Sequence, residues 1–279
     1  IVIYDNLVGS GWLGEDFTYD EATGAVTGWS ESGHVKRASL KELVIPDKTP
    51  KGKKVVAIGD KAFMIPDSEV IITKFGVDSP EGMTSVVIPS TVTKLGEKAF
   101  AQNALKEVDL NGLTEIGARA FYGNDLVKVI IPDTVTVLGE GAFATNDITE
   151  LKLSAGVTVI PQGAFSMNIR LGSVEIPNTV TEICETAFAG ARLTTILLLW
   201  NSYPEFFIAV LTLSLDSFTL ASGSPTTSQL GIPAETSTCT SIKYPSNPCK
   251  DILLTIDNIL STSLLYKFWL EILNFQDEN

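Results

Sequence analysis

The sequence has few residues of the types that usually carry catalysis or hold metal ions. Its 279 residues include a single histidine, His34, and three cysteines. One histidine excludes the Cys/His spacing of structural zinc sites, and three cysteines do not make a disulfide scaffold. The phosphate-loop pattern G-x-x-x-x-G-K-[ST] and the nucleophile pattern G-x-S-x-G are absent from the sequence. We therefore expect no catalytic residue, no metal and no cofactor, and we expect that the protein is not an enzyme.

Positive charge and long apolar runs are also scarce. Twenty basic residues face 33 acidic ones, so the net charge is −13. This charge disfavours nucleic acid and anionic membranes as partners, because both need positive patches. The longest clean apolar run near the C-terminus is Phe206 to Leu215, about half of the ~20 residues that a membrane helix needs. Membrane insertion is therefore disfavoured, and we expect buried strands there.

What the sequence does contain is a tandem repeat. The segment 129–146 reads VIIPDTVTVLGEGAFATN, and the segment 86–103 matches it at 13 of 18 positions. The phenylalanine of each copy recurs every 21 to 23 residues, at Phe100, Phe121, Phe143, Phe165 and Phe188. This period lies within the range of leucine-rich repeats and below that of ankyrin, tetratricopeptide and propeller units.

One repeat contains three short segments. Alternation such as Val129-Ile130-Ile131 indicates a strand with one buried face, and a following proline ends it. Two further apolar positions precede a glycine such as Gly139, where we expect a turn with positive φ. Ala-Phe closes the repeat. In four copies an asparagine follows three residues later, at Asn103, Asn124, Asn146 and Asn168. These asparagines are expected to satisfy backbone groups at a repeated turn, with direct contact to a ligand as the alternative.

The predicted fold is a leucine-rich-repeat solenoid, α/β to mainly β, with about 22 residues per coil. It has one parallel sheet on one face and turns with short helical segments on the other. The phenylalanines should form a stacked column. In the coil 126–143 the inward side chains are expected to be Leu126, Val129, Ile131, Val135, Leu138, Ala142 and Phe143.

The pattern V-x-I-P-x-x-V-T-x-I-G-x-x-A-F closely resembles the BspA-type leucine-rich repeats of bacterial surface proteins. The resemblance covers roughly residues 40–195, with departures at Pro161, Cys184 and Ala191. It implies a surface-exposed or secreted protein with an adhesive or binding role, and it supplies no catalytic residue.

The extent of the repeats divides the chain into three regions: an N-terminal cap (1–39), the solenoid (40–199) and a C-terminal segment (200–279). The cap contains two expected strands, around residues 17–20 and 24–28, and its aromatic residues could alternatively stack on carbohydrate. The first repeat, Leu43 to Phe63, carries an insertion at 49–54, and another follows at about 65–81. Because 43 residues separate the first two repeat prolines, we expect two coils there, one of them degenerate with a strand at 70–72.

The C-terminal segment departs abruptly from the repeats. We expect a helix at about 251–275 from apolar residues at every fourth position. The segment is either a true cap or a non-native tail produced by a shift of the reading frame. Cys239 and Cys249 could pair if the protein is secreted, whereas Cys184 is expected to be a buried free thiol.

Strand alternation places two rows of side chains outside the parallel sheet, and these rows are the candidate partner-binding face. The ten residues are Ser85, Val87, Glu107, Asp109, Lys128, Ile130, Glu150, Lys152, Ser173 and Glu175. The rows either bind a protein on a host or neighbouring cell or merely offset one another's charge in solvent. The favoured function is extracellular or cell-surface protein binding. The alternatives are a structural spacer and a carbohydrate-binding or glycan-active protein using Glu107 and Glu150.

Overall fold

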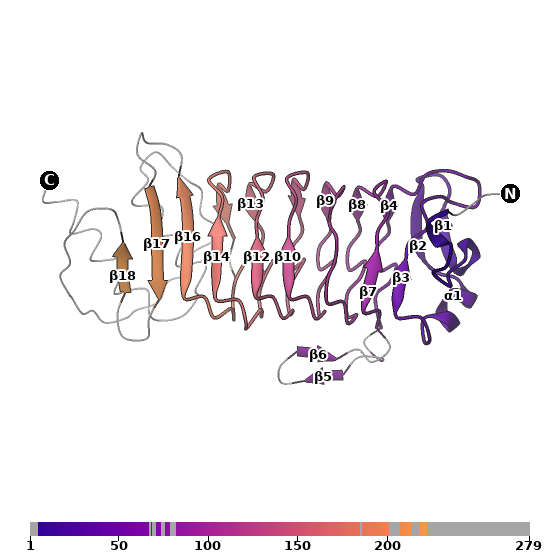
Figure 1. Ribbon diagram of the computed structural model, residues 1–279, viewed down its shortest axis with the longest axis horizontal. Coiled ribbons are helices and arrows are strands. Elements are labelled where there is room, and N and C mark those ends of the chain that lie inside the picture. The colour runs from indigo at the N-terminus through magenta and orange to yellow at the C-terminus, as the bar shows by residue number, and fades with distance from the viewer. Residues whose placement is uncertain are drawn as a thin grey trace, which may run out of the picture.

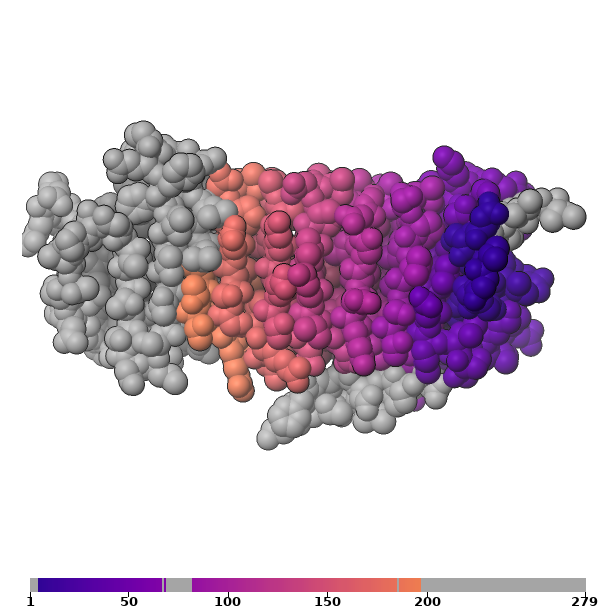
Figure 2. All heavy atoms as spheres, viewed as in Figure 1, coloured from indigo at the N-terminus to yellow at the C-terminus, as the bar shows by residue number. Residues whose placement is uncertain are grey.

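The repeats stack as successive coils of an elongated solenoid, with the N-terminal hairpin at one end of the array and β16 towards the other (Figures 1 and 2). The computed structural model describes residues 5–66, 68, 71–73, 76–78, 82–184, 186–200, 207–213 and 218–221, and gives only the backbone strands for 71–73, 76–78, 197–200, 207–213 and 218–221. The predicted leucine-rich-repeat solenoid of mainly β structure is confirmed.

The first alternating segment of most coils is a strand of a parallel ladder (Figure 1). Strand β3 pairs with β7, and β10, β12, β14 and β16 pair in that order. The bounds are β3 Glu42–Val44, β7 Ser85–Val87, β10 Lys128–Ile130, β12 Glu150–Lys152, β14 Ser173–Ile176 and β16 Thr195–Trp200. Proline follows β3, β7, β10 and β14 within two residues, and it ends the ladder there because it offers no ladder donor.

The expectation of a single sheet opposite helical segments needs correction, because the second apolar pair of each coil forms a parallel ladder too. Strands β2, β4, β8, β9 and β11 pair in that order, and β13 pairs with β15. The bounds are β4 Ala57–Ile58, β8 Lys94–Leu95, β9 Glu115–Ile116, β11 Val137–Leu138, β13 Val159–Ile160 and β15 Glu182–Ile183. The described repeats contain no helix. With inward residues such as Leu138 buried and outward ones such as Val137 exposed, a strand fits this segment better than a helix.

The Ala-Phe segment makes the third side of the coil through paired left-handed residues. The residue two before each phenylalanine has φ between 54° and 63°, and the residue two after it has φ between 57° and 79° in the last five coils. Glycine occupies several of these positions, including Gly123 and Gly141, but Arg119 and Thr145 hold the same conformation. Every second backbone N–H here bonds to the next coil, as from Phe121 N to Ala142 O at 2.8 Å.

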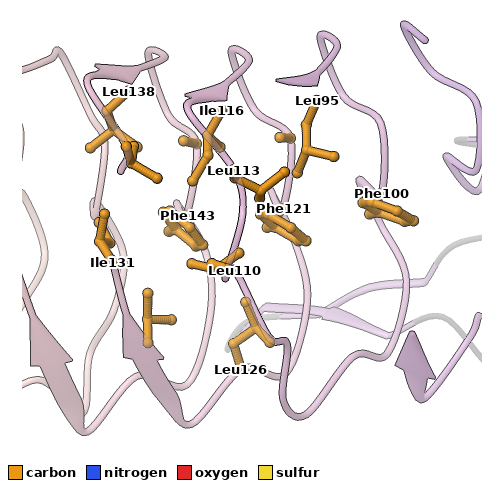
Figure 3. Close-up of a cluster of buried hydrophobic side chains, with 14 of the residues drawn as sticks. Leu95, Phe100, Leu110, Leu113, Ile116, Phe121, Leu126, Ile131, Leu138 and Phe143 are labelled. Atoms are coloured by element: carbon orange, nitrogen blue, oxygen red, sulfur yellow. The ribbon is translucent and has the colours of Figure 1, made fainter. Parts of the chain in front are cut away.

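The predicted phenylalanine column is confirmed. Six rings from Phe63 to Phe188 stack with centroids 5.2–5.8 Å apart and interplanar angles of at most 16°, and Figure 3 shows three of them. All seven side chains predicted to point inward in the coil 126–143 are buried. The apolar residues of neighbouring coils thus form one continuous core.

The glycines at the end of the second ladder are required for a different reason than predicted. Gly96, Gly117 and Gly139 do not have positive φ. A Cβ on Gly117 would lie 2.6 Å from the backbone of Gly96, and one on Gly139 would lie 2.3 Å from Ala118 N. Close contact between coils therefore selects glycine here.

The predicted N-terminal hairpin is present. Strand β1 (Phe17–Asp20) pairs antiparallel with β2 (Ala25–Trp29), and β2 starts the second ladder by pairing with β4. The rings of Phe17 and Trp29 meet Phe63 edge-on. Two 3-10 turns and a short helix lie beside the hairpin: η1 Asp5–Leu7, η2 Gly14–Asp16 and α1 Glu31–Lys36. The aromatic residues of the hairpin thus extend the core of the solenoid. The division of the chain into three regions stays a prediction.

The expectation of two coils between the first two repeat prolines is wrong. Strand β3 pairs directly with β7, and the Phe63 ring stacks directly on Phe100 at 5.6 Å. The extra residues include an antiparallel hairpin of β5 (Ile71–Thr73) and β6 (Gly76–Asp78), drawn below the array in Figure 1. The 43 residues between the first two repeat prolines therefore form one coil with insertions, although their number equals two repeat lengths.

The apolar stretch after the repeats forms strands, as expected, and their predicted burial stays a prediction. Strand β16 continues the first ladder, and β17 (Phe207–Leu213) and β18 (Phe218–Ala221) add to it in antiparallel order. None of the helices in the described ranges is long and apolar enough to span a bilayer. The expected helix at 251–275 and the Cys239–Cys249 pair lie outside the described residues, so the nature of this segment stays a prediction.

Candidate functional site

The ten outward residues of the first ladder, called here the ladder face, lie on the surface as predicted. Nine are exposed, and Ser85 is partly buried. The inward residues between them are buried, including Val129, Leu151 and Val174. The alternation that defines the ladder face is therefore present in the structure, and its role in binding stays a prediction.

The regular part of the ladder face lies on β10, β12 and β14. Lys128 is opposite Glu150, Ile130 is opposite Lys152, and Lys152 is opposite Glu175. Parallel strands are about 4.8 Å apart, so these residues form two close rows on a rigid surface.

The predicted rows are interrupted at Glu107 and Asp109, because the structure has no strand at 106–109. This coil is one residue shorter than the next and turns at Gly112, which has φ of +91°. A short turn leaves the segment without the pairing geometry of β7 and β10, although Val127 N still bonds to Lys106 O at 3.3 Å. The ladder face is thus two patches rather than one continuous sheet.

Charge and apolar surface are unevenly distributed on the ladder face. Lys128 Nζ lies 2.6 Å from Glu150 Oε1, and both side chains are more than half exposed, so this ion pair adds little stability. Among the described residues, Lys152 has no carboxylate within ion-pair distance. Val87 and Ile130 are each nearly half exposed. The centre of the face therefore combines an apolar side chain with an unneutralised cation.

The arrangement does not favour glycan hydrolysis. Glu107 and Glu150 belong to coils on either side of Lys128, and Glu150 is already paired with that lysine. The described residues contain no group of three side chains suited to hold a metal ion. His34 lies on the exposed side of α1 and its ring is 3.4 Å from the Arg37 guanidinium.

Cys184 is a free, partly buried thiol. Burial raises its pKa, and the nearby Glu182 carboxylate raises the pKa further. Both effects favour the protonated thiol, which is the less nucleophilic form.

The outer side of the second ladder was not predicted from the sequence as a candidate surface. Lys94 Nζ and Glu115 Oε1 form an ion pair of 2.6 Å there. Val137 is 52% exposed and Val159 is 38% exposed. The sequence contains a pattern that could have predicted this surface, because a second short alternation of apolar and polar residues precedes the glycine of each repeat.

Residues 72–194 match the family model of the BspA type leucine rich repeat region, in six copies. No curated protein matches the chain. Among solved structures, the chain is similar to the pneumococcal vaccine antigen PcpA, with 20% identity over 70% of this chain and 50% of that one, and a TM-score of 0.50. At this identity the likeness shows the fold alone.

Two further solved structures are similar over part of their length. A leucine-rich repeat protein from Bacteroides ovatus is 28% identical over 64% of this chain and 50% of that one, with a TM-score of 0.48. A leucine rich cell surface protein from Faecalibacterium prausnitzii is 22% identical over 57% of this chain and 67% of that one, with a TM-score of 0.30. The chain spans half the length of PcpA and of the B. ovatus protein.

Proposed function

Because the repeat array of this chain is a BspA-type leucine-rich repeat region, we propose that the protein is a non-enzymatic binding protein, secreted or exposed on a cell surface. It engages a protein on a host or neighbouring cell through the ladder face. Solenoids suit this role because their sheets offer extended, rigid surfaces to a partner.

The observation that carries the proposal is the position of Ile130. This side chain is 47% exposed in the third of the five coils of the ladder face, at the end of β10, which pairs in register with β12. Lys152 lies opposite it on the next strand. Protein interfaces concentrate their binding energy on such central apolar residues, with a polar rim around them.

A site-specific crosslinking experiment tests the proposal. A photoreactive amino acid replaces Ile130 in one variant and Val137 in another. The two side chains are similarly exposed and belong to the same coil, but Val137 lies on the second ladder. After irradiation on intact epithelial or bacterial cells, we expect a defined crosslinked protein from position 130 only. Equal crosslinking from both positions, or none from 130, would contradict the proposal.

A substitution separates binding from a spacer role. Ile130→Asp places a charge at the centre of the face and should weaken capture of the crosslinked partner about tenfold or more. Val137→Asp is the matched control and should leave capture unchanged. A structural spacer predicts no effect from either variant.

Location is tested on its own. Trypsin applied to intact cells of the source organism should remove the protein while a cytoplasmic marker survives. Full protection of the protein in unbroken cells would exclude surface exposure.

A further inference from the structure

The loop between β3 and β4 contains the largest concentration of positive charge in the described chain. Twelve residues (45–56) join these strands, whereas six (88–93) join β7 and β8 in the next coil. The insertion forms a small hairpin, residues 48–54, which we call the lysine hairpin. Its sequence KTPKGKK contains four of the twenty basic residues of the protein.

The lysine hairpin is held in one conformation by many contacts. Lys48 and Lys54 form an antiparallel bridge, and Thr49 N donates to Lys53 O at 2.7 Å. The fully buried Thr49 donates its hydroxyl to Glu21 Oε2 at 2.6 Å. The Lys51 N–H donates to the other oxygen of Glu21 at 3.2 Å. A loop anchored in this way presents its side chains at fixed positions.

The β1–β2 turn supports the hairpin from beneath. Val56 N donates to Gly24 O at 2.9 Å, and the aliphatic stem of Lys53 lies over Gly24. A Cβ on Gly24 would lie 2.7 Å from Lys54 O. Lys53 Nζ also donates to the Ala22 carbonyl oxygen. The insertion is therefore docked on the rest of the fold rather than extended into solvent.

Three of the four lysine side chains of the hairpin have no carboxylate partner among the described residues, whereas Lys48 Nζ lies 3.8 Å from Asp47 Oδ2. Lys51, Lys53 and Lys54 are exposed, and none lies within ion-pair distance of a carboxylate among the described residues. The nearby acids bond to other donors: Glu21 accepts the two bonds from the hairpin itself, and Asp20 accepts from Thr23 and Ala22. Lys53 acts on Asp20 only through its charge, which is a minor cause of the lowered pKa of that carboxyl. Clustered cations that are not neutralised by an ion pair are suited to an external polyanion.

We propose that the lysine hairpin binds a sulfated polysaccharide. This inference rests on the proposed extracellular location, where such chains are met, and it concerns a site separate from the ladder face. The net charge of −13 does not oppose it, because charges are screened beyond about 8 Å at physiological ionic strength. Coils are about 4.8 Å apart, so the more acidic coils beyond the second contribute little at the hairpin.

The residue types in the hairpin distinguish this ligand from other polyanions. Proteins that bind single-stranded nucleic acid stack bases on aromatic side chains, and interfacial membrane segments combine basic with large apolar residues. Residues 48–54 contain neither kind of side chain. Charge contacts to repeated sulfate groups need only the lysines and a rigid support.

The test uses heparin immobilised on a column and the full chain. The triple variant Lys51→Gln, Lys53→Gln and Lys54→Gln removes three exposed charges. A control triple variant removes the same charge from exposed or partly exposed lysines outside the hairpin: Lys61→Gln, Lys98→Gln and Lys106→Gln. Near an anionic surface each lysine contributes about fivefold in affinity, so the first variant should lose on the order of a hundredfold.

We expect the wild type and the control variant to be retained and the hairpin variant to elute at much lower salt. A Lys→Arg triple variant at 51, 53 and 54 should bind like the wild type. Unchanged urea midpoints establish that all variants are folded. Equal losses in both glutamine variants, no retention of the wild type, or equal binding to single-stranded DNA or phosphatidylserine vesicles would overturn the proposal. Crosslinking from position 130 stays unchanged in the hairpin variant, so failure of one site is distinguishable from failure of the other.

Discussion

The buried asparagines beside the phenylalanine column support a prediction that depends on position along the solenoid. Each side-chain amide donates to phenylalanine carbonyl oxygens of its own coil and of the preceding coil. Asn146 Nδ2, for example, lies 2.9 Å from Phe121 O and 3.1 Å from Phe143 O. Its Oδ1 accepts the Leu126 N–H at 3.1 Å. An interior phenylalanine oxygen such as that of Phe121 therefore receives two amide bonds, one from each neighbouring asparagine.

Truncation inside the column leaves one buried group without a partner. In Asn146→Ala, the oxygens of Phe121 and Phe143 each keep the amide of the adjacent asparagine. The Ala144 oxygen, which also accepts from Asn146, keeps the Gly123 N–H. Among these groups only the Leu126 N–H is left without a partner. An unsatisfied buried group costs about 1–3 kcal/mol, so we expect a loss of about 2 kcal/mol in unfolding free energy.

Truncation at either end of the column leaves two groups without partners. Within the described ranges Phe63 O accepts only from Asn103, which also accepts the Met83 N–H. Phe165 O accepts only from Asn168 among the described residues. Asn103→Ala and Asn168→Ala should therefore each cost about 4 kcal/mol, twice the loss at an interior position.

Urea unfolding followed by far-ultraviolet circular dichroism measures these differences. The double variant Asn124→Ala/Asn146→Ala strips both amides from Phe121 O and should lose about 1–3 kcal/mol more than the sum of the single variants. Asn103 and Asn146 share no carbonyl oxygen, so that pair is the control and should be additive. Equal costs at all four positions, or additivity of the first pair, would refute this account of the column.

Three further predictions concern packing, backbone strain and pH. Phe143→Ala should cost about 3–5 kcal/mol, since its ring is fully buried between two others; an unchanged urea midpoint would show that the ring is not core. Thr145→Gly should stabilise the protein by about 0.5–1 kcal/mol, because Thr145 has φ of 57°. Thr136→Gly is its control, because Thr136 lies just before β11 and does not have positive φ; it should destabilise, and the reverse order of midpoints would contradict the strain argument. Burial alone would raise the pKa of Asp16, but bonds from Lys36, a serine hydroxyl and a backbone N–H outweigh it and hold the pKa below its ordinary value. This carboxylate therefore adds stability above its unfolded-state pKa near 4, which is lost as the pH falls through the lower folded value. Unfolding curves from pH 6 to pH 2 should show a smaller acid loss in Asp16→Asn than in the wild type, and parallel curves would exclude the effect.

Periodicity was sufficient to predict the solenoid, its inward residues and the stacked rings. A side chain such as Phe143 recurs once per coil, so stacking follows directly from the repeat length. The outward position of Ile130 followed from alternation in the same way. These predictions concern what one coil repeats, and sequence expresses that repetition directly.

Features that depend on the contact between coils were harder to predict. The glycine at 117 suggested a turn, but the cause is the distance to the backbone of Gly96, which no single repeat reveals. The turn at Gly112 interrupts the ladder face although the neighbouring residues keep their alternation. The lysine hairpin was recognised only as an insertion, because its docking on Glu21 joins segments 28 residues apart.

The departure at Ala191 shows how one irregularity can compensate for another. In the interior coils, a backbone N–H two residues after each asparagine, such as that of Leu126, donates to the asparagine of the next coil. The coil after Asn168 has one extra residue, and the equivalent N–H, at Leu171, bonds instead to the Asn168 backbone oxygen at 3.0 Å. An asparagine at 191 would therefore find its usual donor already occupied. The inserted residue and the missing side chain are two parts of one change, so departures from the consensus are best interpreted in pairs across the contact between coils.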